Sequence, residues 1–409
     1  MGKKDRIMCG LDAGSTKICL LVARVRDSGS LEIMGIGHAE SAGLKRGVVV
    51  DLEQAAACVR KAAAEAEAKS GVSVDWVTVG LSGEGVQSFN CHGAISIEGR
   101  NHEVTHEDMI QVVRAAQSIP VPGNRQLIHV LPQEFFLDGW GDIRNPVGLT
   151  GSRLDADVHV VTCDGSLLQN LVNTANHAEM RVRRVILQNL ASAESVLTPE
   201  EREIGTAVID IGGGTTDIAV LARNAIRFTS VIPVGGLHFT RDLAIGLRTP
   251  LEDAERLKRD TGTVNGNMIA EDEIIEVPGI GTRSSRQMPR KITCQILQDR
   301  AVELMELIKG QLDSGCEREQ MLGGVVLTGG GSLLPGMVDL AEQILEMPAR
   351  LGIPLGVRGL TDALAHPAYA CVVGLAVLSA RSDGDPHRYS GNPGPLPALI
   401  NRVLSWVEG

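Results

Sequence analysis

Two short segments of the sequence combine an aspartate with a glycine-rich turn, and each could bind a phosphate group. They are Gly10–Thr16, which reads GLDAGST, and Ile209–Thr216, which reads IDIGGGTT. Successive turn amides form an anion-binding concavity, and glycine lets the backbone come close to a phosphate. The aspartate of each turn suits a hydrated Mg²⁺ instead. One such turn alone is explained equally well by an ordinary hairpin, but the matched pair favours phosphate binding.

A third glycine-rich segment, Leu327–Gly336 (LTGGGSLLPG), follows a short apolar run and precedes a predicted helix. A glycine turn between a strand and a helix lets a nucleotide base and ribose approach the backbone closely. Taken alone, this segment could be a simple connector. Beside the two aspartate turns, it completes a pattern that predicts nucleotide binding.

The elements that must position these turns alternate between strand and helix, which predicts an α/β fold. We expect paired strands within 7–25 and 207–221, single strands at 77–81 and 325–327, and helices at 52–69, 250–261 and 293–312. Asp51 is the expected N-cap of the helix at 52–69. Each aspartate turn then joins two strands. Because the two turns resemble each other and lie far apart in the chain, the sequence predicts two similar halves that face a shared cleft.

Composition restricts the class of protein. A chain of 409 residues predicts roughly two to four domains. The net charge of -11 argues against a nucleic-acid partner. Eight cysteines without a CxxC pair favour a reducing cytosol. The first residues lack the apolar run of a signal peptide, and the longest apolar stretch, Ala370–Ala380, is too short to span a bilayer.

Residues His102–His106 spell HExxH, the pattern of a zinc protease. That chemistry needs both histidines on one helix. Thr105 is a good N-cap with Asp108 three residues later, which predicts a helix that begins at about His106 and excludes His102. We therefore predict no structural zinc here.

The order of the three glycine-rich segments resembles that of the actin, heat-shock chaperone and sugar kinase superfamily. Longer stretches resemble the bacterial cell-division protein family FtsA. These stretches are Ser82–Gly93, His129–Gly139, Gly151–Thr162, Asp217–Leu221 and Arg241–Lys258. The resemblance covers nearly the whole chain. It implies an actin-like fold of two similar halves around a nucleotide cleft, with a small inserted domain.

The expected boundaries follow from the resemblance and from composition. They are 1–83 and 163–205 for the first half, 84–162 for the inserted domain, 206–381 for the second half with a smaller subdomain at about 235–315, 382–395 for a flexible linker, and 396–408 for a C-terminal amphipathic helix.

The resemblance also implies roles for individual residues toward ATP and Mg²⁺. Asp12 and Asp210 would hold Mg²⁺ through water. The residues implied to bind the phosphates are Gly14, Ser15, Thr16, Lys17, Gly212, Gly213, Gly214 and Thr215. Those implied to bind adenosine are Glu255, Lys258, Gly329, Gly330, Gly331 and Ser332. Without the resemblance, the Glu255/Lys258 pair is better explained as a solvated salt bridge on one helix face. No residue identifies itself as catalytic.

The function that the resemblance implies is an ATP-dependent scaffold of the division ring. Such a protein polymerises with itself, binds the tubulin-like division protein FtsZ, and tethers it to the cytoplasmic face of the inner membrane as a peripheral protein. Later division proteins are further possible partners, and any ATP hydrolysis is expected to be slow. Two alternatives stay open, a phosphotransferase of the same superfamily and an FtsA-like platform protein of pilus assembly.

The segment Thr282–Arg300 is basic in an otherwise acidic chain. The resemblance places the FtsZ contact in the subdomain that contains it, with Arg286 and Arg300 as candidates. A solvated basic face explains the same charges equally well.

The C-terminal segment has apolar residues at helical spacing, which predicts an amphipathic helix on a membrane. Its candidate membrane-binding residues are Leu399, Ile400, Val403, Leu404, Trp406 and Val407. The alternative is a helix that packs back on its own protein. The polar linker before the segment favours a helix that extends to a membrane over one that packs on the same protein.

Overall fold

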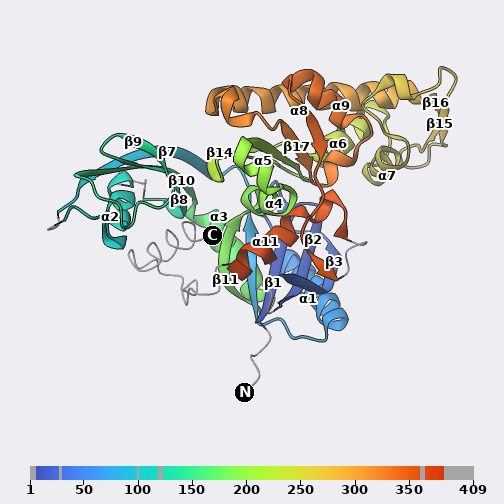
Figure 1. The fold of residues 1–409 in the computed structure, drawn as a ribbon. Helices are drawn as coiled ribbons and strands as arrows, with labels where there is room; N and C mark the ends of the chain where they lie inside the picture. Colours follow the sequence, from blue (N-terminus) through green and yellow to red (C-terminus); the bar gives the residue numbers. More distant parts are fainter. Residues whose placement is uncertain (1–5, 27–29, 99–100, 118–122, 360–363, 382–409) are drawn as a thin grey trace.

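The computed structural model describes residues 6–26, 30–98, 101–117, 123–359 and 364–381. It contains two α/β halves, one above the other in Figure 1, and a small unit that projects to one side between them. The predicted linker at 382–395 and the predicted helix at 396–408 lie outside the described residues.

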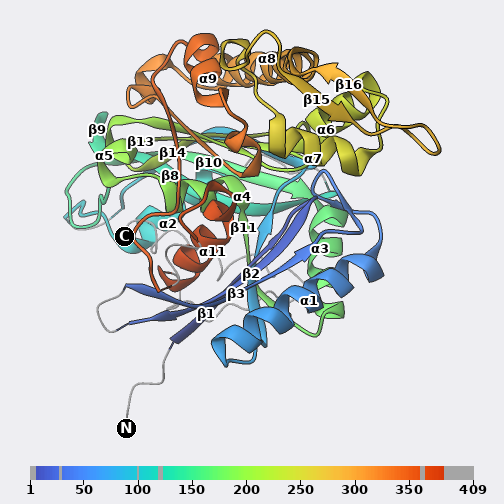
Figure 2. The same cartoon turned by 90° about the vertical axis from the view of Figure 1, so that its right-hand side faces the viewer.

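The first half is built on a mixed sheet with the strand order β11-β6-β1-β2-β3-β19. Its strands are β1 (Arg6–Ala13), β2 (Lys17–Val25), β3 (Leu31–Glu40), β6 (Trp76–Leu81), β11 (Arg181–Leu187) and β19 (Arg358–Gly359). Helices α1 (Leu52–Ser70) and α3 (Gly165–His177) cover one face, as Figure 2 shows. The predicted cap is confirmed, because Asp51 accepts a hydrogen bond from the amide of Gln54 at 3.0 Å. A two-stranded hairpin, β4 (Leu44–Lys45) and β5 (Val48–Val49), precedes α1.

The second half is built on a sheet with the order β14-β13-β12-β17-β18. Its strands are β12 (Thr206–Ile211), β13 (Thr216–Ala222), β14 (Ala225–Ile232), β17 (Val325–Thr328) and β18 (Ala349–Leu351). The helices packed against its outer face are α6 (Gly236–Gly246), α8 (Arg290–Gly315) and α9 (Met337–Leu345). Helix α8 is longer than the predicted 293–312 and starts directly after Pro289, which takes the N-cap position.

The two halves repeat one topology, as the sequence predicts. In each, three consecutive strands form an antiparallel meander, and a later strand pairs in parallel with the first of them. The registers also match, since Asp12 lies opposite Cys19 and Asp210 lies opposite Asp217. Both aspartates therefore end the central strand of their sheet and point toward the same cleft.

Two helices lie between the sheets and join the halves. Helix α4 (Gln188–Val196) contacts β12 and β13, and α11 (Ala370–Arg381) contacts β1 and β2, while the two helices pack on each other. Their crossing is close, because a Cβ at Gly374 would lie 1.7 Å from the carbonyl oxygen of Ala191. A short helix, α5 (Pro199–Ile204), leads from α4 into the second half.

The inserted unit is a four-stranded sheet with the order β7-β10-β8-β9, covered by α2 (His106–Ala116). Its strands are β7 (Val86–Ser96), β8 (Arg125–Leu137), β9 (Trp140–Ile143) and β10 (Arg153–Asp164). Thr105 and Asp108 form a capping box, so α2 begins at His106 and His102 lies outside it. The prediction that these histidines do not share a helix is confirmed.

The far end of the second half carries a smaller group of elements at the upper right of Figure 1. It includes α7 (Leu251–Thr261) and the hairpin of β15 (Ile274–Val277) and β16 (Arg286–Pro289). Helix α7 occupies the position predicted at 250–261. Within the residues that the structure describes, no helix is both long and apolar enough to cross a membrane.

Candidate nucleotide-binding site

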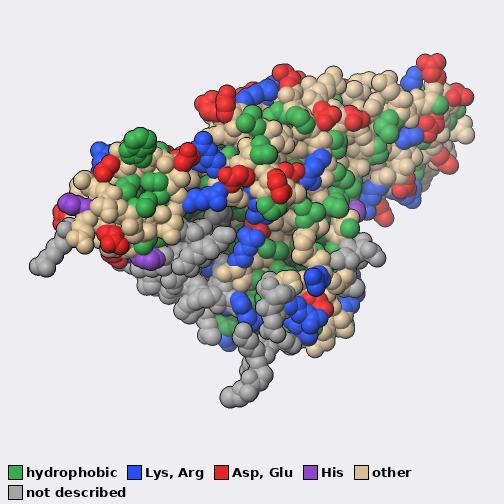
Figure 3. All heavy atoms as spheres, in the orientation of Figure 1, with side chains coloured by type: hydrophobic (Ala, Val, Ile, Leu, Met, Phe, Trp, Pro, Cys, Tyr) green, Lys and Arg blue, Asp and Glu red, His purple; other side chains and the backbone are tan. Residues whose placement is uncertain are grey.

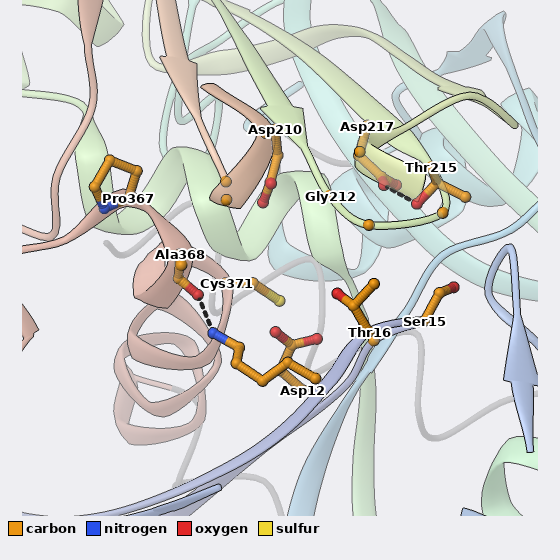
Figure 4. Close-up of a pocket in the computed structure, with 18 of the residues that line it drawn as sticks. Asp12, Ser15, Thr16, Asp210, Gly212, Thr215, Asp217, Pro367, Ala368 and Cys371 are labelled. Atoms are coloured by element: carbon orange, nitrogen blue, oxygen red, sulfur yellow. Dashed lines mark hydrogen bonds between the residues drawn. The ribbon is translucent and has the colours of Figure 1, made fainter. Parts of the chain in front are cut away.

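A cavity of about 570 Å³ lies between the two halves, a size typical of ligand pockets. Both aspartate turns and the third glycine-rich segment line it, as do Glu255 and Lys258. Figure 4 shows the two turns facing each other across the cavity, with Asp12 on one side and Asp210 on the other. The structure therefore brings together nearly all the predicted nucleotide-site residues. The exception is Ser332, which lies behind the cavity wall and donates to the carbonyl of Gly329 at 2.7 Å.

The two aspartate turns are in direct contact. A Cβ added at Gly213 would lie 2.5 Å from the side chain of Thr16, and one at Gly214 would lie 2.4 Å from Oγ of Ser15. Real Cβ atoms do not approach this closely, so the glycines allow two hairpins from different halves to meet. The result is a cavity wall that is mostly backbone and hydroxyl groups, which suits a phosphate chain.

The two carboxylates are buried, and the positive charge of Lys17 acts on both of them. Oδ1 of Asp12 accepts from the side-chain amide of Gln188 at 3.0 Å, and Oδ2 of Asp210 accepts from the hydroxyl of Ser192 at 2.5 Å. Burial raises the pKa of Asp12, and burial raises the pKa of Asp210 to about 6. Two desolvated carboxylates beside a phosphate-shaped wall fit a hydrated Mg²⁺. No group of three or more metal-ligating side chains occurs in the described part of the chain.

The side chain of Lys17 extends along the cavity toward the residues that precede α11. Its Nζ donates to the carbonyl of Ala368 at 2.6 Å and lies 4.4 Å from the ring centroid of Tyr369. Figure 4 shows this bond to the left of Asp12 and below Asp210. The ammonium group is thus held at the cavity by the short turn Pro367–Tyr369, which directly precedes α11.

The opposite end of the cavity is closed by α6 and α7. Nζ of Lys258 donates to the carbonyl of Gly236 at 3.0 Å and to Glu255 at 2.7 Å. Burial acts to raise the pKa of Glu255, but hydrogen bonds from Lys258 and Thr240 outweigh it and lower that pKa. Across from this pair, Gly329 has a φ of +81° and leaves no room for a Cβ beside Asp210. The pair is therefore part of a bonded cluster and is not a solvated surface bridge.

The structure adds residues that sequence reasoning did not select. Ser82, Gln188, Asp217 and Cys371 all line the cavity. Burial raises the pKa of Asp217 to about 7. Asp217 was detectable, because it is an aspartate directly after the second glycine turn. Gln188 carries no such signal, since it is an ordinary polar residue at the boundary of β11 and α4, which the sequence analysis did not predict.

The two candidate FtsZ-binding arginines lie on β16 and α8 of the second half, and neither lines this cavity. Arg286 is exposed on β16 and its guanidinium donates to the carbonyl of Leu247. Arg300 on α8 is bonded to Asp242 and Glu303, at 2.5 and 2.6 Å. The two side chains therefore differ in how free they are to meet a partner.

Solved structures with the same fold include a chain of the PilM–PilN type IV pilus biogenesis complex, with a TM-score of 0.66 and 18% identity over 91% of this chain and 98% of that chain. Another is MreB5 of Spiroplasma citri bound to ADP, with a TM-score of 0.54 and 14% identity over 90% of this chain and 94% of that chain. At these identities the likeness shows the fold alone. It confirms the prediction of an actin-like α/β fold.

Sequence comparisons identify the family. The model described as cell division protein FtsA matches residues 207–374, and that of the SHS2 domain inserted in FtsA matches residues 83–162. The chain is 38% identical over 413 residues to the cell division protein FtsA of Pseudomonas aeruginosa, which covers 100% of this chain and 99% of that protein. It is 35% identical over 412 residues to the FtsA of Escherichia coli K12, which covers 98% of each. The chain therefore belongs to the FtsA family of cell-division proteins.

Proposed function

We propose that this protein binds Mg·ATP between its two halves and serves as a self-assembling scaffold that tethers FtsZ to the cytoplasmic face of the cell membrane. The observation that carries the nucleotide part is the pair of facing aspartate turns, whose glycines allow two hairpins to close one cavity. Membership of the FtsA family supports the role in division. On the face in Figure 3, the described acidic and basic side chains are interspersed.

Each part of the cavity has a chemical task in this proposal. Backbone amides and hydroxyls of the two turns would bind the phosphates, and Lys17 would add one positive charge. Asp12 and Asp210 would hold Mg²⁺ through its water ligands. When bound, Mg²⁺ supplies the positive charge that the phosphates and the two carboxylates lack. Glu255, Lys258 and the Gly329–Gly331 turn would hold the adenosine.

The test of the nucleotide site is calorimetry on Asp210→Ala. We expect Mg·ATP affinity to fall at least about tenfold, while binding of adenosine changes little, because only the phosphate end loses its metal support. Asp299→Ala, which removes an exposed aspartate of α8, is the matched control and should bind as the wild type does. Unchanged Mg·ATP affinity in Asp210→Ala would remove this carboxylate from the site.

We further propose that ATP hydrolysis is slow and times assembly. Turnover should stay below about 1 per second, the low end of ordinary enzymes. Transfer of phosphate to a small acceptor would instead support a phosphotransferase. The pilus-platform alternative has less support, because the relatives that match over the full chain are division proteins.

The proposed FtsZ contact at Arg286 and Arg300 is better tested with a single variant than by reversing both charges. Reversing Arg300 would place a new negative charge beside Asp242 and Glu303, so lost binding could reflect local unfolding. Arg286→Glu changes an exposed residue, and Arg256→Glu on α7 is an exposed control in the same region. We expect the first to weaken binding of the FtsZ tail peptide at least about tenfold and the second to leave it intact. Equal binding by both would move the contact elsewhere.

A further inference from the structure

The inserted unit belongs to the first half in sequence but is bonded to the second half. The hydroxyl of Ser88 donates to the carbonyl of Thr229 on β14 at 2.7 Å. The side-chain amide of Gln133 donates to the carbonyl of Ile226 at 2.7 Å, and the ring of His159 bonds the hydroxyl of Thr229 at 2.8 Å. Any change in how the two halves sit must therefore move this unit or break its bonds to β14.

The point where the chain enters the inserted unit is also part of the cavity wall. Ser82, buried at the end of β6, donates to Oδ1 of Asp217 at 2.6 Å and lies 3.3 Å from the hydroxyl of Thr215. Thr215 in turn donates to Oδ2 of Asp217 at 2.9 Å, the bond drawn in Figure 4. Ser82 is thus bonded to the second phosphate turn.

The first phosphate turn reaches the same residue through the β4–β5 hairpin. The amide of Gly47 donates to Oγ of Ser15 at 3.3 Å. A Cβ added at Gly47 would lie 2.4 Å from the carbonyl oxygen of Ser82, so the hairpin tip packs directly on it. Both phosphate turns therefore contact the entry to the inserted unit, one directly and one through Gly47.

Just beyond this entry, an arginine bonds the start of β7 to the end of β10, its antiparallel neighbour. Arg125 donates to the carbonyl of Gly85 and to Oδ1 of Asp164, both at 2.9 Å, and to the hydroxyl of Thr162 at 3.0 Å. Its side chain is only 11% exposed, so these bonds are shielded from water. A shift at Ser82 is consequently passed to β7 and β10 together.

From this geometry we infer that Ser82 is a positioning residue of the second phosphate turn, and that a nucleotide in the cleft sets how firmly the inserted unit is held. The inference rests on the proposed function, because it requires ATP at these turns. ATP that bridges both turns favours the state in which Ser82, Asp217 and Thr215 are bonded. A ligand shifts an equilibrium only by such a difference in affinity between states.

The test is hydrogen–deuterium exchange on the full chain, with and without saturating Mg·ATP, paired with calorimetry on the same samples. In the wild type, we expect Mg·ATP to slow exchange about tenfold in peptides that cover 82–86 and 163–165. Ser82→Ala should lose this slowing at nucleotide concentrations that calorimetry shows to be saturating. Ser88→Ala also removes one hydroxyl bond to the second half, but away from the cavity, and should keep the slowing.

Asp217→Ala removes the acceptor from the other side of the same bond and should behave as Ser82→Ala does, so the test survives if one variant fails to fold. The same slowing in Ser82→Ala and the wild type would overturn the inference. So would a wild type that binds Mg·ATP without any change at 82–86, which leaves the proposed function standing. A wild type that binds no Mg·ATP by calorimetry would overturn the proposed function, and this inference with it.

Discussion

Close packing at Gly214 is the residue-level feature that joins the two phosphate turns. A Cβ there would lie 2.4 Å from Oγ of Ser15 and 3.0 Å from Cα of Arg46. Gly214→Ala should therefore push the turns apart, with a loss of about 1–3 kcal/mol in the free energy of unfolding. Mg·ATP affinity, measured by calorimetry, should fall at least about tenfold in the same variant.

Gly310 provides the matched control. It lies exposed in α8 with open space where a Cβ would stand. Gly310→Ala should raise the free energy of unfolding by up to about 1 kcal/mol, because alanine is the better helix former. Nucleotide affinity should not change. If Gly214→Ala binds Mg·ATP as tightly as Gly310→Ala does, close contact of the turns is not needed for binding.

The sequence predicts some site residues better than others for a chemical reason. Asp12 and Asp210 lie in glycine turns whose similarity can be recognised in the amino-acid sequence. Lys17 follows the first turn, but its bond to Ala368 joins residues 351 positions apart, which no local pattern announces. Gln188 reaches Asp12 across 176 positions in the same way. A glycine turn is a local feature and can be predicted from a few neighbouring residues. The side chains that complete the site come from distant elements and cannot be predicted in this way.

Among the elements, the crossing of α4 and α11 holds the two halves at a fixed distance. Ser195 on α4 donates to the carbonyl of Ala370 at 2.7 Å, and Gly374 lies against the backbone of Ala191. Gly374→Ala should force the helices apart and cost about 3 kcal/mol or more in urea unfolding. Gly310→Ala, also a glycine in a helix, is expected to be neutral or stabilising. Equal stability of the two variants would mean that the crossing adapts without cost.

The contact between the inserted unit and β14 should weaken in acid because of His159. This residue is 1% exposed, and burial lowers its pKa to about 4 from 6.5. The unfolded chain takes up a proton near pH 6.5 while the folded chain does not, so stability is full above that pH and falls toward pH 4. The difference in pKa predicts that His159 lowers the free energy of unfolding by about 2 kcal/mol between pH 7.5 and pH 5.

Urea unfolding of the wild type and of His159→Gln at the two pH values measures this effect. Glutamine does not titrate, so the difference between pH 7.5 and pH 5 should shrink by about 2 kcal/mol in the variant. The control is His92→Gln, which removes the exposed His92 of the same sheet, whose pKa is raised by its hydrogen bond with Asp157. In this variant the difference between pH 7.5 and pH 5 should not shrink. An identical pH dependence in the wild type and His159→Gln would exclude His159 as the source.

Elements with strong local signals match their predictions closely. Helix α1 begins at its predicted cap, α2 begins after its capping box, and the two aspartate turns join the predicted strands. The bounds of α8 are less predictable, since it has no side-chain cap and runs from Arg290 to Gly315, beyond the predicted 293–312 at both ends. Local caps determine where a helix starts, while tertiary packing determines how far it continues.

At the scale of the whole molecule, the repeated turns predict the two halves, and the fold confirms them. The bonds from the inserted unit to β14 were beyond prediction, because they join Ser88, Gln133 and His159 to residues 70 to 141 positions away. They use main-chain carbonyls and neutral side chains, which leave no charge or hydropathy pattern. The shape of the assembled protein thus depends on contacts that only the folded chain reveals.

The last prediction concerns the membrane tether and rests on sequence, since residues 396–408 lie outside the described part of the chain. Leu399, Val403, Trp406 and their neighbours recur at helical spacing, and Arg402 is almost the sole positive charge. Apolar burial must then dominate over attraction to anionic lipid. With Leu396, the candidate membrane-binding residues make seven apolar side chains. Their burial would contribute on the order of 10 kcal/mol gross, but folding a short helix removes much of this.

One copy of such a helix should bind weakly, while many copies in a polymer should bind tightly. Sedimentation with vesicles should therefore rise steeply with protein concentration and change little between low and high salt. Val403→Glu should abolish it and leave Mg·ATP binding intact, because the substitution places a charge in the apolar face. Arg402→Gln is the matched control and should keep most of the binding. A chain truncated after Gly394 that still sediments with vesicles would show that the anchor lies elsewhere in the protein.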